Sequence, residues 1–254
     1  MKLLNKDAWK NKQYTVFVTS YTGLHYFNQW SHVIRNNENV QLVIVDTGNQ
    51  TAASTITDIP VFQLSQNVGC AGCWNACALL GFNYYNLDKI IIGQDDAMFD
   101  ENMIHLIWNE TADDMLTGAY DRGFTYSLFG LTKKFWTDVG AFDENFVYVS
   151  YEDNDYIHRT RLLNKQWKSL NFSADLNSNI TSKYLSDDVR SMNRAYMIEK
   201  WGHFEGVYEH PFNNPHLAPN ECVIHKNLTD VYGDVSTFPS ITEFETLMSD
   251  IYVT

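Results

Sequence analysis

Two adjacent aspartates end one of the most apolar segments of the sequence, "KIIIGQDDAMF" (residues 89–99). Asp95 and Asp96 follow a run of isoleucines that is typical of a buried strand, so both carboxylates are expected where that strand reaches the surface. Like charges in contact repel each other unless a cation or hydrogen-bond donors meet them. Because successive side chains of a strand point to opposite sides, one carboxylate would bind a divalent metal and the other would accept hydrogen bonds or order the loop. The alternative is a structural turn before a helix capped by Asp100.

Two further segments place polar residues where strands end or helices begin. Asp46 closes the apolar segment "VQLVIVD", and "NVGCAGCWN" sets Asn67, Gly69 and Asn75 around a tight turn and a helix start. Glycine lets backbone approach a ligand closely, and the amide groups of a helix start favour anions. The segment lacks the Gly-Lys-Ser/Thr ending of the phosphate loop of nucleotide hydrolases. It is therefore a candidate ligand-binding turn of another kind.

A third group of acids lies in "YEDNDYIHR" (residues 151–159). Glu152, Asp153 and Asp155 precede Arg159 on a predicted helix, and acids at a helix start are common for dipole reasons alone. A carboxylate that faces a bound hydroxyl group could instead act as a general base. The residues by themselves leave both interpretations open.

The elements that must position these groups alternate along the first half of the chain. Apolar strands are expected at residues 14–21, 40–49, 61–67 and 89–93, with helices at 24–37, 70–85 and 101–110. Strands that are apolar throughout and alternate with helices predict an α/β domain of Rossmann-like type, with a mainly parallel central sheet covered by helices on both faces.

Ligands of such sheets bind beyond the carboxyl ends of the strands. The polar residues at those ends are expected to gather along one edge of the sheet; they are Ser20, Asp46, Asn67, Asp95 and Asp96.

After residue 110 the pattern changes to short strands, a glycine-rich turn and three helices, and four of the five prolines fall in the tail from Val207. We expect a single domain over 1–254, with a ligand-binding half over about 1–110 and a second half with the tail over about 111–254. Aromatic residues of the second half that could stack on a ligand are Trp136, Tyr148, Tyr151 and Trp201.

Composition narrows the class of protein. The 254 residues carry a net charge of −13, which argues against a large sequence-independent contact with a nucleic-acid backbone. The sequence has no apolar stretch of membrane-spanning length and no secretory signal at its start, so a cytoplasmic protein with no transmembrane segment is predicted. Cys70, Cys73 and Cys77 share one face of the predicted helix, where cysteine acts as a small apolar residue, and a metal site made by them is the alternative.

In this order along the chain, the motifs resemble those of the GT-A-fold glycosyltransferases, in particular the large family-2-like group that uses nucleotide sugars. The resemblance covers residues 15–201. It rests on "VTSY", "VDTGN", "NVGCAGCWN", "QDDAMF", "VGAFDENFVYVSYEDNDYIHR" and "NRAYMIEKWG". It implies a metal-dependent transferase that moves a sugar from a nucleotide-diphosphate sugar to an acceptor hydroxyl by direct displacement, with inversion at the sugar carbon.

The resemblance also implies a role for each matched residue. Ser20, Tyr21 and Asp46 would hold the nucleoside, and Asp95 would touch the ribose or the donor sugar. The turn residues that would line the donor are Asn67, Gly69 and Asn75.

The same resemblance assigns the reacting groups. Asp96 would bind the manganese or magnesium ion that bridges the diphosphate. Asp153 would be the catalytic base, and Glu152 would bind the acceptor or take that role itself. Many relatives complete the metal site with a later histidine; the expected stretch "NFSADLNSNIT" has Asp175 instead, which leaves His210 as the candidate.

The acceptor suggested by this interpretation is a glycan or a lipid-linked sugar, with a protein or a modified nucleobase as further options. Two other functions stay open: a non-catalytic GT-A-like module that binds a sugar or nucleotide, and a nucleotidyltransferase. Release of pyrophosphate from a nucleoside triphosphate would identify the nucleotidyltransferase.

Overall fold

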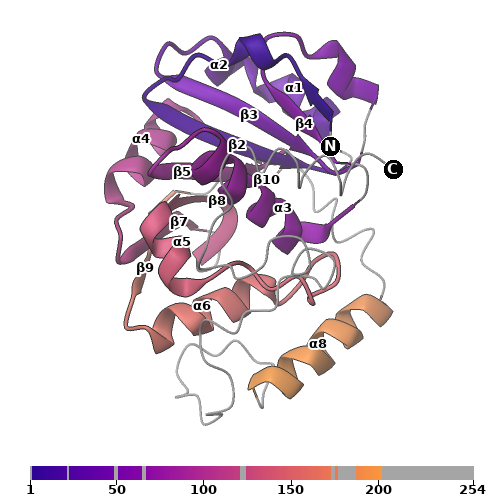
Figure 1. Cartoon of the computed structure of the whole chain (residues 1–254), viewed down its shortest axis with the longest axis vertical. Helices are drawn as coiled ribbons and strands as arrows, with labels where there is room; N and C mark the ends of the chain where they lie inside the picture. Colours follow the sequence, from indigo (N-terminus) through magenta and orange to yellow (C-terminus); the bar gives the residue numbers. More distant parts are fainter. Residues whose placement is uncertain are drawn as a thin grey trace.

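A computed structural model describes residues 2–21, 23–48, 51–64, 67–120, 124–172, 175–176 and 187–201. Its centre is an eight-stranded sheet (Figure 1). The strands lie in the order β1 (Lys2–Leu4), β4 (Val61–Gln63), β3 (Val40–Asp46), β2 (Tyr14–Ser20), β5 (Lys89–Gln94), β8 (Phe124–Thr132), β7 (Met115–Tyr120) and β9 (Gln166–Ser169).

The middle of the sheet is parallel, as the apolar segments predict. Strands β4, β3, β2 and β5 pair in parallel, and every residue of β2 and β3 is buried. Strand β8 pairs antiparallel with both β5 and β7, β7 pairs in parallel with β9, and β1 adds an antiparallel edge. The sheet is therefore mixed, with its parallel part built by the first half of the chain.

Helices cover both faces of the sheet, as predicted, and each face has its own apolar core. One face carries α1 (Leu24–Trp30), α2 (His32–Arg35) and α4 (Glu101–Glu110); the other carries α3 (Gly69–Leu79), α5 (Lys133–Val139) and α6 (Glu152–Leu162). Short helical turns occur at η1 (Lys6–Ala8) and η2 (Thr51–Thr55).

Two predicted helices differ in detail from those observed. The helix expected over 24–37 is divided at the buried Ser31, and the helix expected over 70–85 passes into the π-helical turn η3 (Leu80–Tyr84). The Asp100 side chain accepts a hydrogen bond from the Met103 N–H at 2.9 Å, so Asp100 caps α4 as predicted.

Two further elements connect distant parts of the sequence. The short strands β6 (Ala97–Met98) and β10 (Asp175–Leu176) pair antiparallel, and α8 (Asp187–Trp201) lies beside α6 (Figure 1). Among the helices of the described residues, none is long and apolar enough to cross a lipid bilayer.

Candidate functional site

The carboxyl ends of the parallel strands meet at one edge of the sheet. Ser20 pairs with Asp46 in the register of β2 and β3, and the Asp95 N–H donates to the Thr19 carbonyl oxygen at 3.1 Å. The Thr47 N–H donates to the Ser20 carbonyl oxygen at 2.8 Å. The expectation that five polar residues gather at one edge is therefore confirmed for Ser20, Asp46 and Asp95.

Asp95 is held by the loop that follows β2. The Ser20 hydroxyl donates to its Oδ2 at 2.5 Å, and a Cβ added at Gly23 would lie 2.3 Å from the same oxygen. Burial raises the pKa of Asp95 to about 7; the hydrogen bond from Ser20 opposes this rise, and the charge of Asp96 adds to it. Asp95 thus orders the first loop of the site.

Asp96 has the opposite character. Its side chain is buried, and its Oδ1 has no hydrogen-bond partner within the part of the chain that the structure describes. Burial raises its pKa to about 6. An unpartnered carboxylate oxygen is costly to bury, and a Mg²⁺ or Mn²⁺ ion would supply the missing partner.

The remaining ligands of such an ion are not assembled by the described residues, since no group of three or more histidine, cysteine, aspartate or glutamate side chains lies close enough to hold a metal. One carboxylate is nevertheless a fitting donor set for Mg²⁺, which commonly takes one or two carboxylates together with phosphate oxygens and water. His210 lies outside the described residues. The pairing of β10 with β6 brings the backbone of Asp175 opposite Met98, two residues after Asp96.

Two predicted donor-binding residues lie at this edge with different exposure. Asp46 is fully buried; its Oδ1 accepts from the Gly48 N–H and its Oδ2 from the Gln63 amide, both at 3.0 Å. Tyr21 lies next to Ser20 at the same edge, and its side chain is exposed. Contact of either residue with a nucleoside stays a prediction.

The turn before α3 has the geometry that its sequence suggests. The Asn67 side chain accepts from the Gly69 N–H at 2.9 Å, and Gly69 has a φ of +73°. Asn75 is buried further along α3, where its amide bonds the backbone of Phe142 in both directions and donates to Glu144 at 2.7 Å. This geometry gives Asn75 a structural role that sequence reasoning missed, and its contact with a ligand stays a prediction.

Glu152 and Asp153 open α6. Glu152 is buried, and its Oε2 has no hydrogen-bond partner among the described residues. Burial raises the pKa of Glu152, and the charge of Asp153 raises it further. Asp153 is half-buried and accepts from the Asn154 N–H at 2.8 Å, and burial raises its pKa as well. Asp153 is therefore the more accessible of the two acids.

Two cysteines near the start of α3 are influenced by both groups of acids. Burial raises the pKa of the Cys70 thiol, and the charges of Glu152, Asp153 and Asp96 raise it further. Burial likewise raises the pKa of Cys73 to about 12, with contributions from Glu144, Asp95 and Asp46. Charges from both groups of acids therefore act on the thiols near the start of α3. Nothing in the sequence indicated that charges from both groups of acids would act on these two cysteines.

Asp143 and Asp155 form a second set of acids, and both are buried in ion pairs with basic side chains. Asp155 forms ion pairs with Arg159 at 2.9 Å and with Lys200 of α8 at 2.7 Å, and Lys200 also pairs with Asp143. We name these four residues the compensated cluster. Burial works to raise the pKa of Asp155, but the charges of Arg159 and Lys200 outweigh it and hold the pKa below its usual value.

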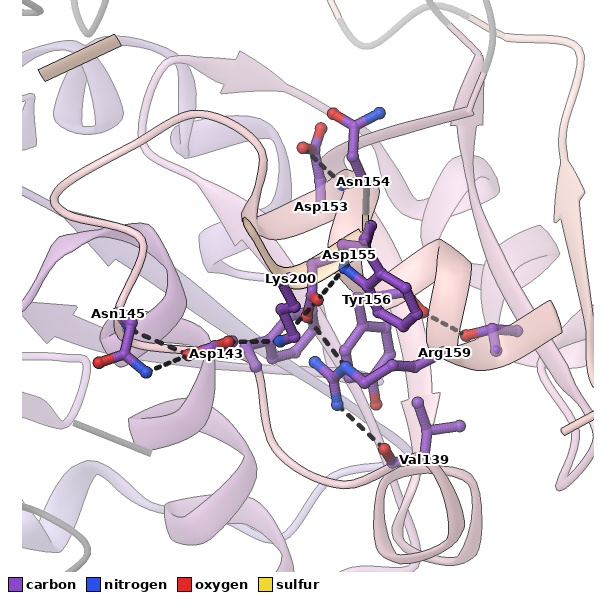
Figure 2. Close-up of polar contacts among 12 residues, drawn as sticks. Val139, Asp143, Asn145, Asp153, Asn154, Asp155, Tyr156, Arg159 and Lys200 are labelled. Atoms are coloured by element: carbon purple, nitrogen blue, oxygen red, sulfur yellow. Dashed lines mark hydrogen bonds and ion pairs between the residues drawn. The ribbon is translucent and has the colours of Figure 1, made fainter. Parts of the chain in front are cut away.

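Figure 2 shows this cluster on one side of the start of α6, with Asp153 pointing away from it. The Trp201 indole N–H donates to Asp155 at 2.9 Å, and Tyr196 donates to Asp143 at 2.7 Å. The cluster therefore fixes α6 to α8, and Asp153 takes no part in it. Sequence reasoning grouped Asp155 with its neighbours and missed Asp143 and Lys200, because these two residues lie 57 positions apart in the chain.

Comparison with solved structures identifies the fold. A mannosyltransferase from Pyrobaculum calidifontis, solved with GDP-Man and Mn²⁺, matches 77% of this chain and 63% of its own at 12% identity and a TM-score of 0.50. Mannosyl-3-phosphoglycerate synthase from Rubrobacter xylanophilus matches 81% of this chain and 78% of its own at 11% identity and a TM-score of 0.50. The chain thus spans less than two thirds of the length of the mannosyltransferase.

A 4-diphosphocytidyl-2C-methyl-D-erythritol synthase from Anaerococcus prevotii is also similar, covering 75% of this chain and 97% of its own at 11% identity and a TM-score of 0.45. No protein-family model and no curated protein sequence matches this chain. The two likenesses at a TM-score of 0.50, together with the mixed sheet and its helical layers, show that the chain has the GT-A fold.

Proposed function

We propose that this protein is a metal-dependent, inverting glycosyltransferase that moves a sugar from a nucleotide-diphosphate sugar to an acceptor hydroxyl. The observation that carries the proposal is a pair of buried carboxylate oxygens without a partner among the described residues, one on Asp96 and one on Glu152. They come from the two halves of the chain, and the charges of both residues act on the Cys70 thiol at the start of α3. We name Asp95, Asp96, Glu152 and Asp153 the rim carboxylates.

Their burial indicates a site prepared for a ligand. A folded protein loses stability by keeping carboxylate oxygens dry and unpaired, so such atoms are usually found where a cation or substrate completes them. Asp96 is the residue suited to a divalent ion, since Asp95 already receives the Ser20 hydroxyl. When bound, Mg²⁺ or Mn²⁺ would neutralise the charge that develops on a leaving diphosphate.

The chain's own residues supply binding, orientation and proton transfer in this proposal. Ser20, Tyr21 and Asp95 orient the donor at the edge of the sheet. Asp153 accepts the proton of the acceptor hydroxyl while the hydroxyl oxygen attacks the sugar carbon. The bond from that carbon to the diphosphate breaks at the same time. A raised pKa brings Asp153 closer to neutrality, which suits a group that must take and release a proton.

Further details of the proposal come from the sequence. The donor would bind mainly to residues of the first 110 positions and the acceptor to the second half, in a cytoplasmic protein. A glycan or lipid-linked sugar is the acceptor that we favour. Glu152, which is buried next to the proposed base Asp153, would help to bind it.

The test is thermal stability of the protein against nucleoside diphosphates and nucleotide sugars, with and without Mn²⁺. A ligand that binds only the folded state adds about 2.7 kcal/mol at a hundred times its Kd, which moves the melting temperature by several degrees. We expect a shift that needs both Mn²⁺ and one class of nucleotide. Absence of any shift from a folded protein would contradict the proposal and favour a non-catalytic module.

A matched pair of variants sharpens this test. Asp96→Asn should remove the Mn²⁺-dependent part of the shift, whereas Asp100→Asn should not, because an asparagine side chain can also cap α4. Release of a nucleoside diphosphate would support the transferase, and release of pyrophosphate from a nucleoside triphosphate would support a nucleotidyltransferase instead. An equal shift in both variants would remove Asp96 from the metal site.

A further inference from the structure

The segment Val147–Tyr151, just before the rim carboxylate Glu152, has an unusual backbone. Tyr148, Ser150 and Tyr151 have φ values of 59°, 96° and 73°. Residues other than glycine rarely adopt this left-handed region, and the surrounding structure must hold them in it. Three such residues within four positions therefore need an external clamp.

Asn193 of α8 is one side of that clamp. It is 1% exposed, and its Oδ1 accepts from the Val147 N–H at 2.8 Å. Its Nδ2 lies within hydrogen-bond distance of three carbonyl oxygens, those of Val147 at 2.9 Å, Val149 at 3.0 Å and Ser150 at 3.2 Å. A single side chain thus satisfies the backbone of most of the segment.

The start of α3 is the other side. The Cys70 N–H donates to the Tyr148 carbonyl oxygen at 2.6 Å, and a Cβ added at Gly69 would lie 2.8 Å from the Tyr148 Cα. A hydrogen bond from the Ser150 backbone also reaches the Glu152 carboxylate and works to lower its pKa. The segment is therefore fixed between two helices and fixes Glu152 in turn.

The result is an aromatic ring held open to solvent beside the site. Four aromatic residues of the second half were candidates for stacking on a ligand, but Trp136 and Trp201 are 1% and 2% exposed and belong to apolar cores. Tyr151 is half-buried against the small core of α8. Tyr148 is 51% exposed and lies five residues before Asp153, and its backbone contacts the start of α3.

We propose that Tyr148 is a platform for the sugar ring of a saccharide acceptor, and that Asn193 is the positioning residue that holds it there. The inference rests on the proposed function and adds the class of acceptor. An aromatic face offers a large apolar surface with few rotatable bonds, which suits the C–H face of a sugar ring. The strained backbone has a purpose in this interpretation, since it leaves the ring exposed near the start of α3 rather than in the core.

The experiment measures transfer of the sugar from the nucleotide sugar identified by thermal shift to methyl glycosides of glucose, galactose, mannose and N-acetylglucosamine. A second assay measures the release of nucleoside diphosphate when no glycoside is added and water is the acceptor. The variants are Tyr148→Phe, Tyr148→Gly and Asn193→Ala, with Met192→Ala as the control, because Met192 neighbours Asn193 and is 57% exposed. Tyr148→Gly removes the ring and suits the left-handed backbone, so its melting temperature should not fall.

We expect Tyr148→Gly to lose on the order of tenfold in kcat/KM for the saccharide that stimulates the wild type, with the KM for the nucleotide sugar unchanged. Asn193→Ala should likewise lower kcat/KM for the saccharide and leave the KM for the nucleotide sugar unchanged. Tyr148→Phe and Met192→Ala should behave like the wild type. A loss confined to the nucleotide-sugar KM, no loss in Tyr148→Gly, or no stimulation of the wild type by any glycoside would overturn the inference. In those cases the protein would still bind the nucleotide sugar and still release nucleoside diphosphate without a glycoside, so the proposed function would stand. Loss of both binding and release in the wild type would overturn the proposed function as well.

Discussion

The two sets of buried acids differ in how their charge is met. In the compensated cluster, Asp143 and Asp155 share Lys200, Asp155 also pairs with Arg159, and the pKa of Asp155 is lowered. Among the rim carboxylates, burial raises every pKa, and the oxygens Asp96 Oδ1 and Glu152 Oε2 lack partners in the described residues.

Both sets meet at the start of α6, where Glu152 and Asp153 belong to the rim and Asp155 to the cluster. One turn of helix thus carries acids of opposite physical character. The difference teaches that burial alone does not mark a functional acid: a buried and paired acid holds elements together, whereas a buried and unpaired acid is kept at a cost in stability.

The largest difference should appear in the reaction itself. Asp153→Asn removes the proposed base but keeps the shape of the side chain, so release of nucleoside diphosphate in the presence of acceptor should fall about 10²–10⁴-fold. The thermal shift with nucleotide and Mn²⁺ should be retained. Full turnover in this variant would move the base to Glu152.

The compensated cluster should respond in stability. Lys200→Met leaves Asp143 and Asp155 without their shared cation, so the free energy of unfolding should fall by about 3–5 kcal/mol. Denaturant unfolding at neutral pH measures this loss. A change below about 1 kcal/mol would show that the cluster does not hold α8 to α6.

The two sets should also respond to pH with opposite sign. Asp95 and Asp96 have native pKa values of about 7 and about 6, above the unfolded value of about 3.9. Their protonated forms favour folding, so their contribution is complete below pH ~4 and is lost as the pH rises through these values. The lowered pKa of Asp155 gives a contribution that is present above pH ~4 and is lost as the pH falls through its native value.

Asp96→Asn measures the contribution of Asp96 to the pH dependence of stability. In protein freed of metal by a chelator, its stability relative to the wild type should improve between pH 4 and pH 8 by on the order of 1–2 kcal/mol. Unfolding in denaturant at the two pH values measures the difference. An unchanged difference would mean that Asp96 is charged and satisfied in the free protein.

The smallest effect is expected for an exposed ion pair. Lys168 and Glu110 lie 2.6 Å apart, but both side chains are 44% exposed. Lys168→Ala should lower the free energy of unfolding by at most about 1 kcal/mol, and it serves as the control for Lys200→Met. An equal loss in the two variants would abolish the contrast between buried and exposed pairs.

Much of the fold was predictable because local patterns decide it. The apolar runs of β2, β3 and β5 indicate strands buried on both faces, and glycines and capping residues mark where α3 and α4 begin. The edge formed by Ser20, Asp46 and Asp95 follows from strand ends alone. The antiparallel β8 and β7 and the pairing of β6 with β10 were not predicted, since strand partners are chosen by contacts between distant segments.

The sequence by itself thus determined the layers of the domain and the edge at which polar groups collect. Which acids are paired was decided only by the tertiary structure, because Lys200 reaches Asp143 and Asp155 from another helix. The same holds for the clamp of Asn193 on the segment before Glu152 and for the separation of exposed Tyr148 from buried Trp136 and Trp201. The physical reason is that periodicity fixes which face of an element is apolar, whereas burial, pairing and pKa depend on what packs against that face.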